Sequence, residues 1–143
     1  MTTAYAFTIE KWSCGYTFST TDVKSSRGRS YADRRTLEVS GTLTHPRKSS
    51  GRRMELRFSS PVRLEMEYVG YHLADVGSVT WSRNSKAFTG HLYIADDALP
   101  CIIPLLIAGK LRHVLLQSKG PFRGSLTFMS YSFIEELTDD YFN

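Results

Sequence analysis

The sequence has only two cysteines, Cys14 and Cys101, among its 143 residues. Two cysteines are too few for the disulfide framework that holds small secreted domains together. Residues 1–12 alternate apolar and polar side chains, without the basic start and continuous apolar stretch of a secretory signal. We therefore expect a cytoplasmic protein whose two thiols are reduced.

Long apolar runs are also missing. The longest one, residues 98–109, is much shorter than the roughly 20 residues that a membrane-spanning helix needs. The run predicts one buried apolar helix near residues 97–109, capped by Asp96 or Asp97 and ended by Gly109. No membrane span is expected.

The common catalytic motifs are absent as well. The sequence contains no glycine-rich nucleotide-binding motif, no phosphate loop, no nucleophile elbow and no zinc-binding His-Glu-x-x-His. Its four histidines are scattered, whereas a zinc site needs three or four converging ligands. We expect no metal and no cofactor, and these absences disfavour an enzyme.

The composition is that of an ordinary globular domain. Hydrophobic residues make up 41% of the chain and aromatic residues 13%, which is too apolar for a disordered protein. A chain of this length is typical of one domain with a real core, so we interpret residues 1–143 as a single domain.

Alternating apolar and polar residues, the period of a strand with one buried face, recur along the chain. Residues 111–117 fit either a helix or a strand, and the turn that follows them favours the strand. Gly41 interrupts one alternating series, which indicates a bulge or a close approach of another backbone. The predicted strands are Ala4–Trp12, Thr36–His45, Arg53–Phe58, Val62–Tyr68, Val76–Arg83, Ala87–Ala95 and Phe122–Ile134.

These elements predict a mainly β (α+β) fold. We expect about seven or eight strands, in an antiparallel β-sandwich or a strongly curved sheet (a half-barrel), with the one helix buried. The clearest predicted hairpin joins Arg53–Phe58 to Val62–Tyr68 through a turn at residues 59–61. A basic mobile loop near residues 23–35 and an acidic C-terminal tail, residues 135–143, complete the predicted organisation.

Basic residues are concentrated in one part of the chain. Segment 24–57 holds ten basic residues against three acidic ones, a surplus of seven positive charges, whereas the whole chain carries +4. Arginine accounts for eight of the ten, and its planar guanidinium binds carboxylate or phosphate through paired hydrogen bonds. This concentration predicts an acidic or phosphate-bearing partner.

We therefore predict a small non-catalytic interaction module that binds an acidic protein partner through arginine-rich loops. Nucleic-acid binding by the same surface, without sequence preference, is the alternative, because nearby tyrosine and phenylalanine rings could stack on unpaired bases. The residues predicted to contact the partner are Arg27, Arg29, Tyr31, Arg34, Arg35, Arg47, Lys48, Arg52 and Arg53.

Other interpretations remain open at the level of the sequence. The basic loops could serve only solubility, and the many aromatic residues could line a pocket, not located here, of an enzyme or of an apolar-ligand carrier. The acidic tail could lie against the basic loops and mask them. Exposed edge strands would also allow homodimerisation by sheet extension.

Overall fold

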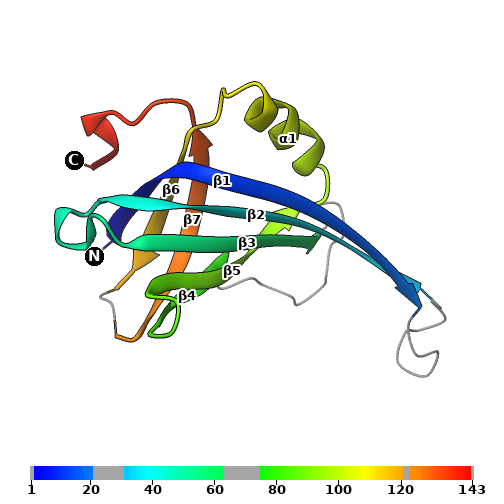
Figure 1. Ribbon diagram of the computed structural model, residues 1–143, viewed down its shortest axis with the longest axis horizontal. Helices are drawn as coiled ribbons and strands as arrows, with labels where there is room; N and C mark the ends of the chain where they lie inside the picture. The colour runs from blue at the N-terminus through cyan, green and yellow to red at the C-terminus, as the bar shows by residue number, and fades with distance from the viewer. Residues whose placement is uncertain (1, 21–30, 63–74, 121–122, 143) are drawn as a thin grey trace.

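The computed structural model describes residues 2–20, 31–62, 75–120 and 123–142. Figure 1 shows its long curved strands, with one helix lying outside them. The strands are β1 Thr2–Thr20, β2 Tyr31–His45, β3 Arg53–Val62, β4 Gly77–Ser82, β5 Ala87–Ala95, β6 His113–Lys119 and β7 Ser125–Ile134. The helix is α1 Leu99–Ile107, and the two 3-10 turns are η1 Arg47–Ser49 and η2 Asp139–Phe142.

The strands form a closed barrel in the order β1-β2-β3-β5-β4-β7-β6. Closure comes from β1 and β6, which pair antiparallel from Thr2 opposite Lys119 to Thr8 opposite His113. The mainly β fold with one helix is confirmed, and so is the strand assigned near residues 111–117. The predicted sandwich or strongly curved half-barrel is broadly consistent with this architecture, but the sheet goes further and closes on itself, so that β1 has a neighbour on each side.

One pair of strands in the barrel is parallel. β3 lies beside β5 from Arg53 opposite Ala87 to Phe58 opposite Leu92, where an all-antiparallel sheet was expected. The predicted turn at residues 59–61 is also wrong, since β3 continues to Val62 with a register shift after Ser59. Such an irregularity accommodates Pro61, which has no amide hydrogen for the ladder. The rest of the second strand predicted for this hairpin, residues 63–68, lies outside the described residues.

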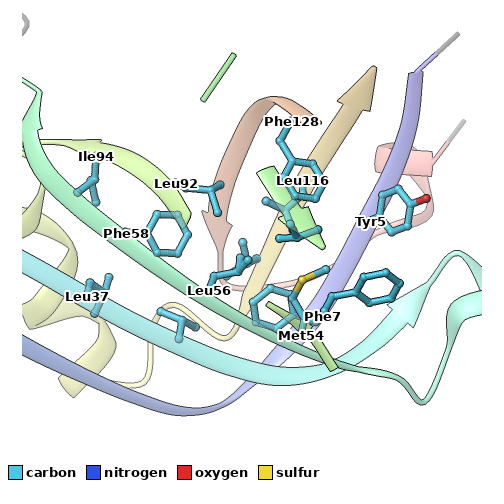
Figure 2. Packing of buried hydrophobic residues seen from close by; sticks show 14 of the residues in the cluster. Tyr5, Phe7, Leu37, Met54, Leu56, Phe58, Leu92, Ile94, Leu116 and Phe128 are labelled. Atoms are coloured by element: carbon cyan, nitrogen blue, oxygen red, sulfur yellow. The ribbon is translucent and has the colours of Figure 1, made fainter. Parts of the chain in front are cut away.

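The barrel interior is filled by the alternating apolar residues of the strands. Leu37 and Val39 of β2 and Leu56 and Phe58 of β3 are at most 2% exposed. Their side chains point into one shared core (Figure 2). Side chains of successive strand residues point to opposite faces, so the residues between them lie on the outer surface of the barrel.

The helix α1 is present, but the prediction that it is buried is wrong. Only Leu99 and Leu106 are buried, while Leu105 and Ile107 are 43% and 71% exposed. A helix that lies against the outside of a closed barrel contacts it along one side only. Ala98 is the N-cap and makes no side-chain cap hydrogen bond, so the predicted aspartate cap is also wrong. None of the described helices is long and apolar enough to cross a membrane.

Gly41 and Gly90 are strand glycines that lie where another backbone comes too close for a side chain. A Cβ atom added to Gly41 would overlap the carbonyl oxygen of Thr8, and one added to Gly90 would overlap that of Ser78. The close approach that the sequence indicated at Gly41 is confirmed. Both contacts are with the backbone of the neighbouring strand, so both positions require glycine.

We expect Gly41→Ala to destabilise the protein by about 3 kcal/mol or more, because a backbone clash cannot be relieved by a rotamer change. Gly15→Ala is the matched control in a neighbouring strand, since its added Cβ would meet only the Thr36 hydroxyl, at 3.0 Å. Urea unfolding of the three proteins measures the difference. Equal stabilities for the two variants would contradict the backbone clash inferred at Gly41.

Candidate interaction surface

The hairpin of β1 and β2 extends past the barrel. β2 pairs with β3 only from Thr36 to Thr42, yet β1 and β2 continue to pair as far as Thr20 opposite Tyr31. We call residues 16–20 with residues 31–35 the arm. Figure 1 shows the arm projecting beyond the ends of the other strands. Among the described residues, each of its strands has only the other as a neighbour.

The arm exposes two aromatic side chains on one face. Tyr16 and Phe18 are each 62% exposed, and they lie opposite Arg35 and Asp33 in the β1–β2 register. Period-2 alternation places them on the face that continues the barrel interior through Leu37. That face continues beyond the last core layer, and most of the surface of both rings is exposed there.

The charges of the arm differ between its two faces. Arg35 and Asp33 form an ion pair, Nη2 to Oδ2, of 3.8 Å, which leaves the aromatic face close to neutral. Arg34 is exposed on the opposite face, and no carboxylate of the described residues pairs with it. The arm therefore offers one neutral aromatic face and one basic face.

The other predicted contact residues lie at the opposite end of β2. Arg47 and Lys48 lie on η1 and are exposed, and Arg52 follows. We call these three residues the turn group. The path along β2 from Arg35 to His45 is roughly 33 Å at the usual rise per residue. The structure therefore does not bring the predicted residues together on one surface, but separates the arm from the turn group.

Several predicted contacts are partly engaged within the protein. Arg53 pairs with Glu10 at 3.3 Å and with Glu55 at 4.0 Å. The Arg52 guanidinium lies over the Trp81 ring, 5.3 Å from its centroid. Arg27 and Arg29 lie outside the described residues. For Tyr31 the structure gives the backbone pairing with Thr20, and the predicted loop at residues 31–35 is instead part of β2.

The acidic tail lies near the turn group. The Phe142 ring stacks on the His45 ring, with centroids 3.8 Å apart and planes within 9° of parallel. His45 is the last residue of β2, and Pro46 connects it to η1. This contact places η2, with Asp139 and Asp140, beside the chain that leads into the turn group. Masking of that group by the tail remains a hypothesis, because no ion pair joins them among the described residues.

A groove of about 510 Å³ lies on the outer face of the barrel. Its exposed lining comes from the four neighbouring strands β1, β2, β3 and β5 and was not predicted from the sequence. Which polar residues share a surface depends on strand order, and the parallel β3–β5 pair was not expected. The exposed charged or titratable side chains lining the groove are Lys11, Glu38, Glu55, Arg57 and His91.

The groove is electrostatically balanced. Arg57 Nη2 lies 2.6 Å from Glu38 Oε1. The Arg57 side chain is 58% exposed and the Glu38 side chain 50%. Because solvent screens such an exposed ion pair, it stabilises the fold by less than about 1 kcal/mol. His91 Nε2 hydrogen-bonds with the Ser59 hydroxyl. Burial lowers the pKa of His91, and the positive charges of Arg34 and Arg57 lower it further. A serine–histidine pair could act as nucleophile and base.

The pair nevertheless lacks the rest of such a site. Among the described residues, no carboxylate contacts the His91 ring to orient it, as the third member of a catalytic triad does. Nor do the described residues contain a group of three or more His, Cys, Asp or Glu side chains that could hold a metal ion. The exposed arm is therefore the stronger candidate site.

The histidines on the barrel predict how stability depends on pH. Burial lowers the pKa of His91 and of His113, with nearby arginines adding to the effect. Below about pH 6.5, the ordinary pKa of histidine, these two histidines are protonated in the unfolded chain but stay neutral to lower pH in the folded protein. The free energy of unfolding should therefore fall as pH drops from 7 toward 5. His91→Gln with His113→Gln should flatten this fall in denaturant titrations, and an unchanged slope would contradict the assignment.

The tail contact predicts a masked polyanion site. Deleting residues 135–143 should raise heparin affinity several-fold, because it removes the tail carboxylates that compete with heparin for the basic turn group. At physiological salt, exposed charges interact over only about 8–10 Å, and the contact of Phe142 with His45 holds the tail close to that group. Adding Arg47→Gln and Lys48→Gln to the deletion should remove the gain. Unchanged heparin binding by the deletion variant would rule out masking.

Comparison with known proteins adds no relative. No family model matches the chain, and neither the curated proteins nor the solved structures include a significant match. A functional proposal for this protein therefore depends on its own geometry: the neutral aromatic face of the arm, the basic face behind it, and the distant turn group.

Proposed function

We propose that the protein is a non-catalytic interaction module whose arm binds an acidic protein partner. The observation that carries the proposal is the pair of aromatic side chains, Tyr16 and Phe18, each 62% exposed on a hairpin that projects from the barrel. The partner's apolar side chains would cover these rings. Its carboxylates would pair with the basic residues around them.

The residue types suit a protein interface. Tyrosine, tryptophan and arginine supply most of the residues that dominate binding energy in protein complexes. In the arm, Tyr16 lies directly opposite Arg35, and side chains in such a pair have Cβ atoms about 4.5–5.5 Å apart.

The charge of the arm supports an acidic partner. Arg34 is exposed on the basic face, and the segment joining the two strands contributes Lys24, Arg27 and Arg29 against Asp22. Arginine binds carboxylates through paired, charge-assisted hydrogen bonds. An acidic surface that meets the arm therefore finds apolar anchors and cations together.

The neutral aromatic face favours protein over nucleic acid. Asp33 lies on that face beside Arg35. If nucleic-acid bases stacked on the two rings, the phosphates of that strand would come near the Asp33 carboxylate and be repelled by it. Nucleic acid is nevertheless the second candidate, because a two-stranded β-ribbon can enter the major groove of DNA. The two candidates differ in salt dependence, since phosphate binding weakens log-linearly with salt as counterions are released.

Capture from native lysate on the immobilised protein, with and without nuclease, tests the proposal. We expect Tyr16→Ser with Phe18→Ser to reduce the captured partner about tenfold or more, as loss of central aromatic anchors does. Arg34→Gln should weaken capture and lower its salt dependence. Nuclease treatment should leave the captured protein unchanged.

Matched controls lie on the barrel away from the arm. Met129→Ser removes an apolar side chain of comparable exposure, 42%, and Arg83→Gln removes an exposed arginine between β4 and β5. Neither should reduce capture. Capture that is abolished by nuclease would favour the nucleic-acid candidate. Equal losses in the arm and control variants would reject the arm as the contact surface.

A further inference from the structure

Among the described residues, one edge of the arm has no neighbouring strand. The pairing of β1 with β6 ends at Thr8, and the last contact on that side is the Ile9 N–H, which donates to the Arg112 carbonyl at 2.7 Å. From Lys11 to Thr20, β1 pairs on its other side with β2 alone among the described residues. Within the part of the chain that the structure describes, no strand therefore pairs with the backbone donors and acceptors along this edge.

This edge lacks the features that usually protect an exposed strand. Natural sheets shorten their edge strands, or place charged residues or proline on them, to prevent pairing with other chains. Residues 12–20 read Trp-Ser-Cys-Gly-Tyr-Thr-Phe-Ser-Thr and contain neither a charge nor a proline. The β2 edge of the arm, in contrast, carries Asp33, Arg34 and Arg35. The arm is thus protected along β2 and open along β1.

Stability gives a second reason to expect a further strand. A two-stranded hairpin alone in water is marginally stable, and three or more strands are needed for independent stability. Where the arm leaves the barrel it has two strands, and its aromatic side chains are largely exposed. A third strand added along β1 would satisfy the open backbone groups and pack against these side chains.

We propose that the β1 edges of two copies of this chain pair antiparallel, across a two-fold axis near Gly15, to form a homodimer. The two arms then become one four-stranded sheet in the order β2-β1-β1-β2. In this register, Trp12 of one copy lies opposite Phe18 of the other, and Cys14 lies opposite Tyr16. Aromatic and β-branched pairs across an antiparallel ladder stabilise it by about 0.2–1 kcal/mol each.

Charge complementarity favours a second copy over an acidic strand. Along the open edge the sole charged residue between positions 11 and 20 is Lys11, so an acidic strand would find one cation to pair with. The two-fold register places Lys11 opposite Ser19, and no like charges face each other. Self-pairing of this kind makes an isologous interface, the commonest type in homodimers.

The dimer uses the edge of the arm, whereas the proposed partner uses its faces. The two can therefore fail separately. Arg34→Gln changes a residue of β2 that lies outside the β1–β1 ladder, so it should weaken partner capture and leave the dimer intact. Ser13→Lys with Thr17→Lys, on the β1 edge, should give a monomer. The dimer would double the aromatic surface by placing two copies of Tyr16 and Phe18 on one continuous sheet.

Sedimentation velocity of the full chain over a concentration series tests the dimer. We expect the wild-type protein to dimerise. Ser13→Lys with Thr17→Lys should raise the dimer dissociation constant at least about tenfold. In the proposed register, position 13 of each copy lies opposite position 17 of the other, so this variant has two directly opposed lysine pairs. Ser78→Lys with Thr80→Lys is the matched control: both residues are exposed on β4, which has β5 and β7 on its two sides. The control should remain dimeric.

A charge-swapped variant tests the register itself. Ser13→Lys with Thr17→Glu places each lysine opposite a glutamate of the other copy, so dimerisation should return. A short bis-maleimide should crosslink the wild-type dimer through Cys14, and Cys14→Ser, but not Cys101→Ser, should prevent this. A monomeric wild type at the highest concentration, or a dimer that both lysines leave intact, would overturn the proposal. Circular dichroism confirms that each variant is folded.

Discussion

The antiparallel pairing of β1 with β6 is the constraint on which the rest of this structure depends. It joins the first described strand to the strand that follows α1 and turns an open sheet into a barrel. Closure gives the alternating apolar residues one enclosed core, and neighbouring strands of the barrel approach closely at Gly41 and Gly90. It also ends at Thr8, so the rest of β1 continues without that neighbour.

The proposed interaction surfaces follow from this early end. The barrel needs only part of β1 and β2, and the remainder becomes an arm with an uncharged open edge, a neutral aromatic face and a basic face. The turn group follows the other end of β2. The acidic tail lies near it, because the Phe142 ring stacks on the ring of His45, the last residue of β2. One pair of long strands therefore sets the distance between the two basic groups.

Much of the fold could be predicted from local pattern. Alternation identified the core positions of β2 and β3, such as Val39 and Leu56, and a glycine within that pattern correctly indicated a close backbone approach at Gly41. Predictions that depended on neighbours were less successful. The run that forms α1 is apolar at every position and predicted burial, but a closed barrel leaves a helix outside it, with Ile107 71% exposed. A serine-serine-proline sequence predicted a turn where β3 continues to Val62.

The candidate site shows the same division. The sequence by itself determined the composition of the surfaces: the arginines of segment 24–57, the aromatic residues near them and the absence of charge in residues 12–20. Only the tertiary structure decided which of these residues share a surface. It separated Arg35 from Arg47, engaged Arg53 with Glu10, and left Tyr16 and Phe18 exposed. The physical reason is that alternation fixes the face of a strand on which a side chain lies. Strand order and register, which long-range pairing sets, fix what lies beside it.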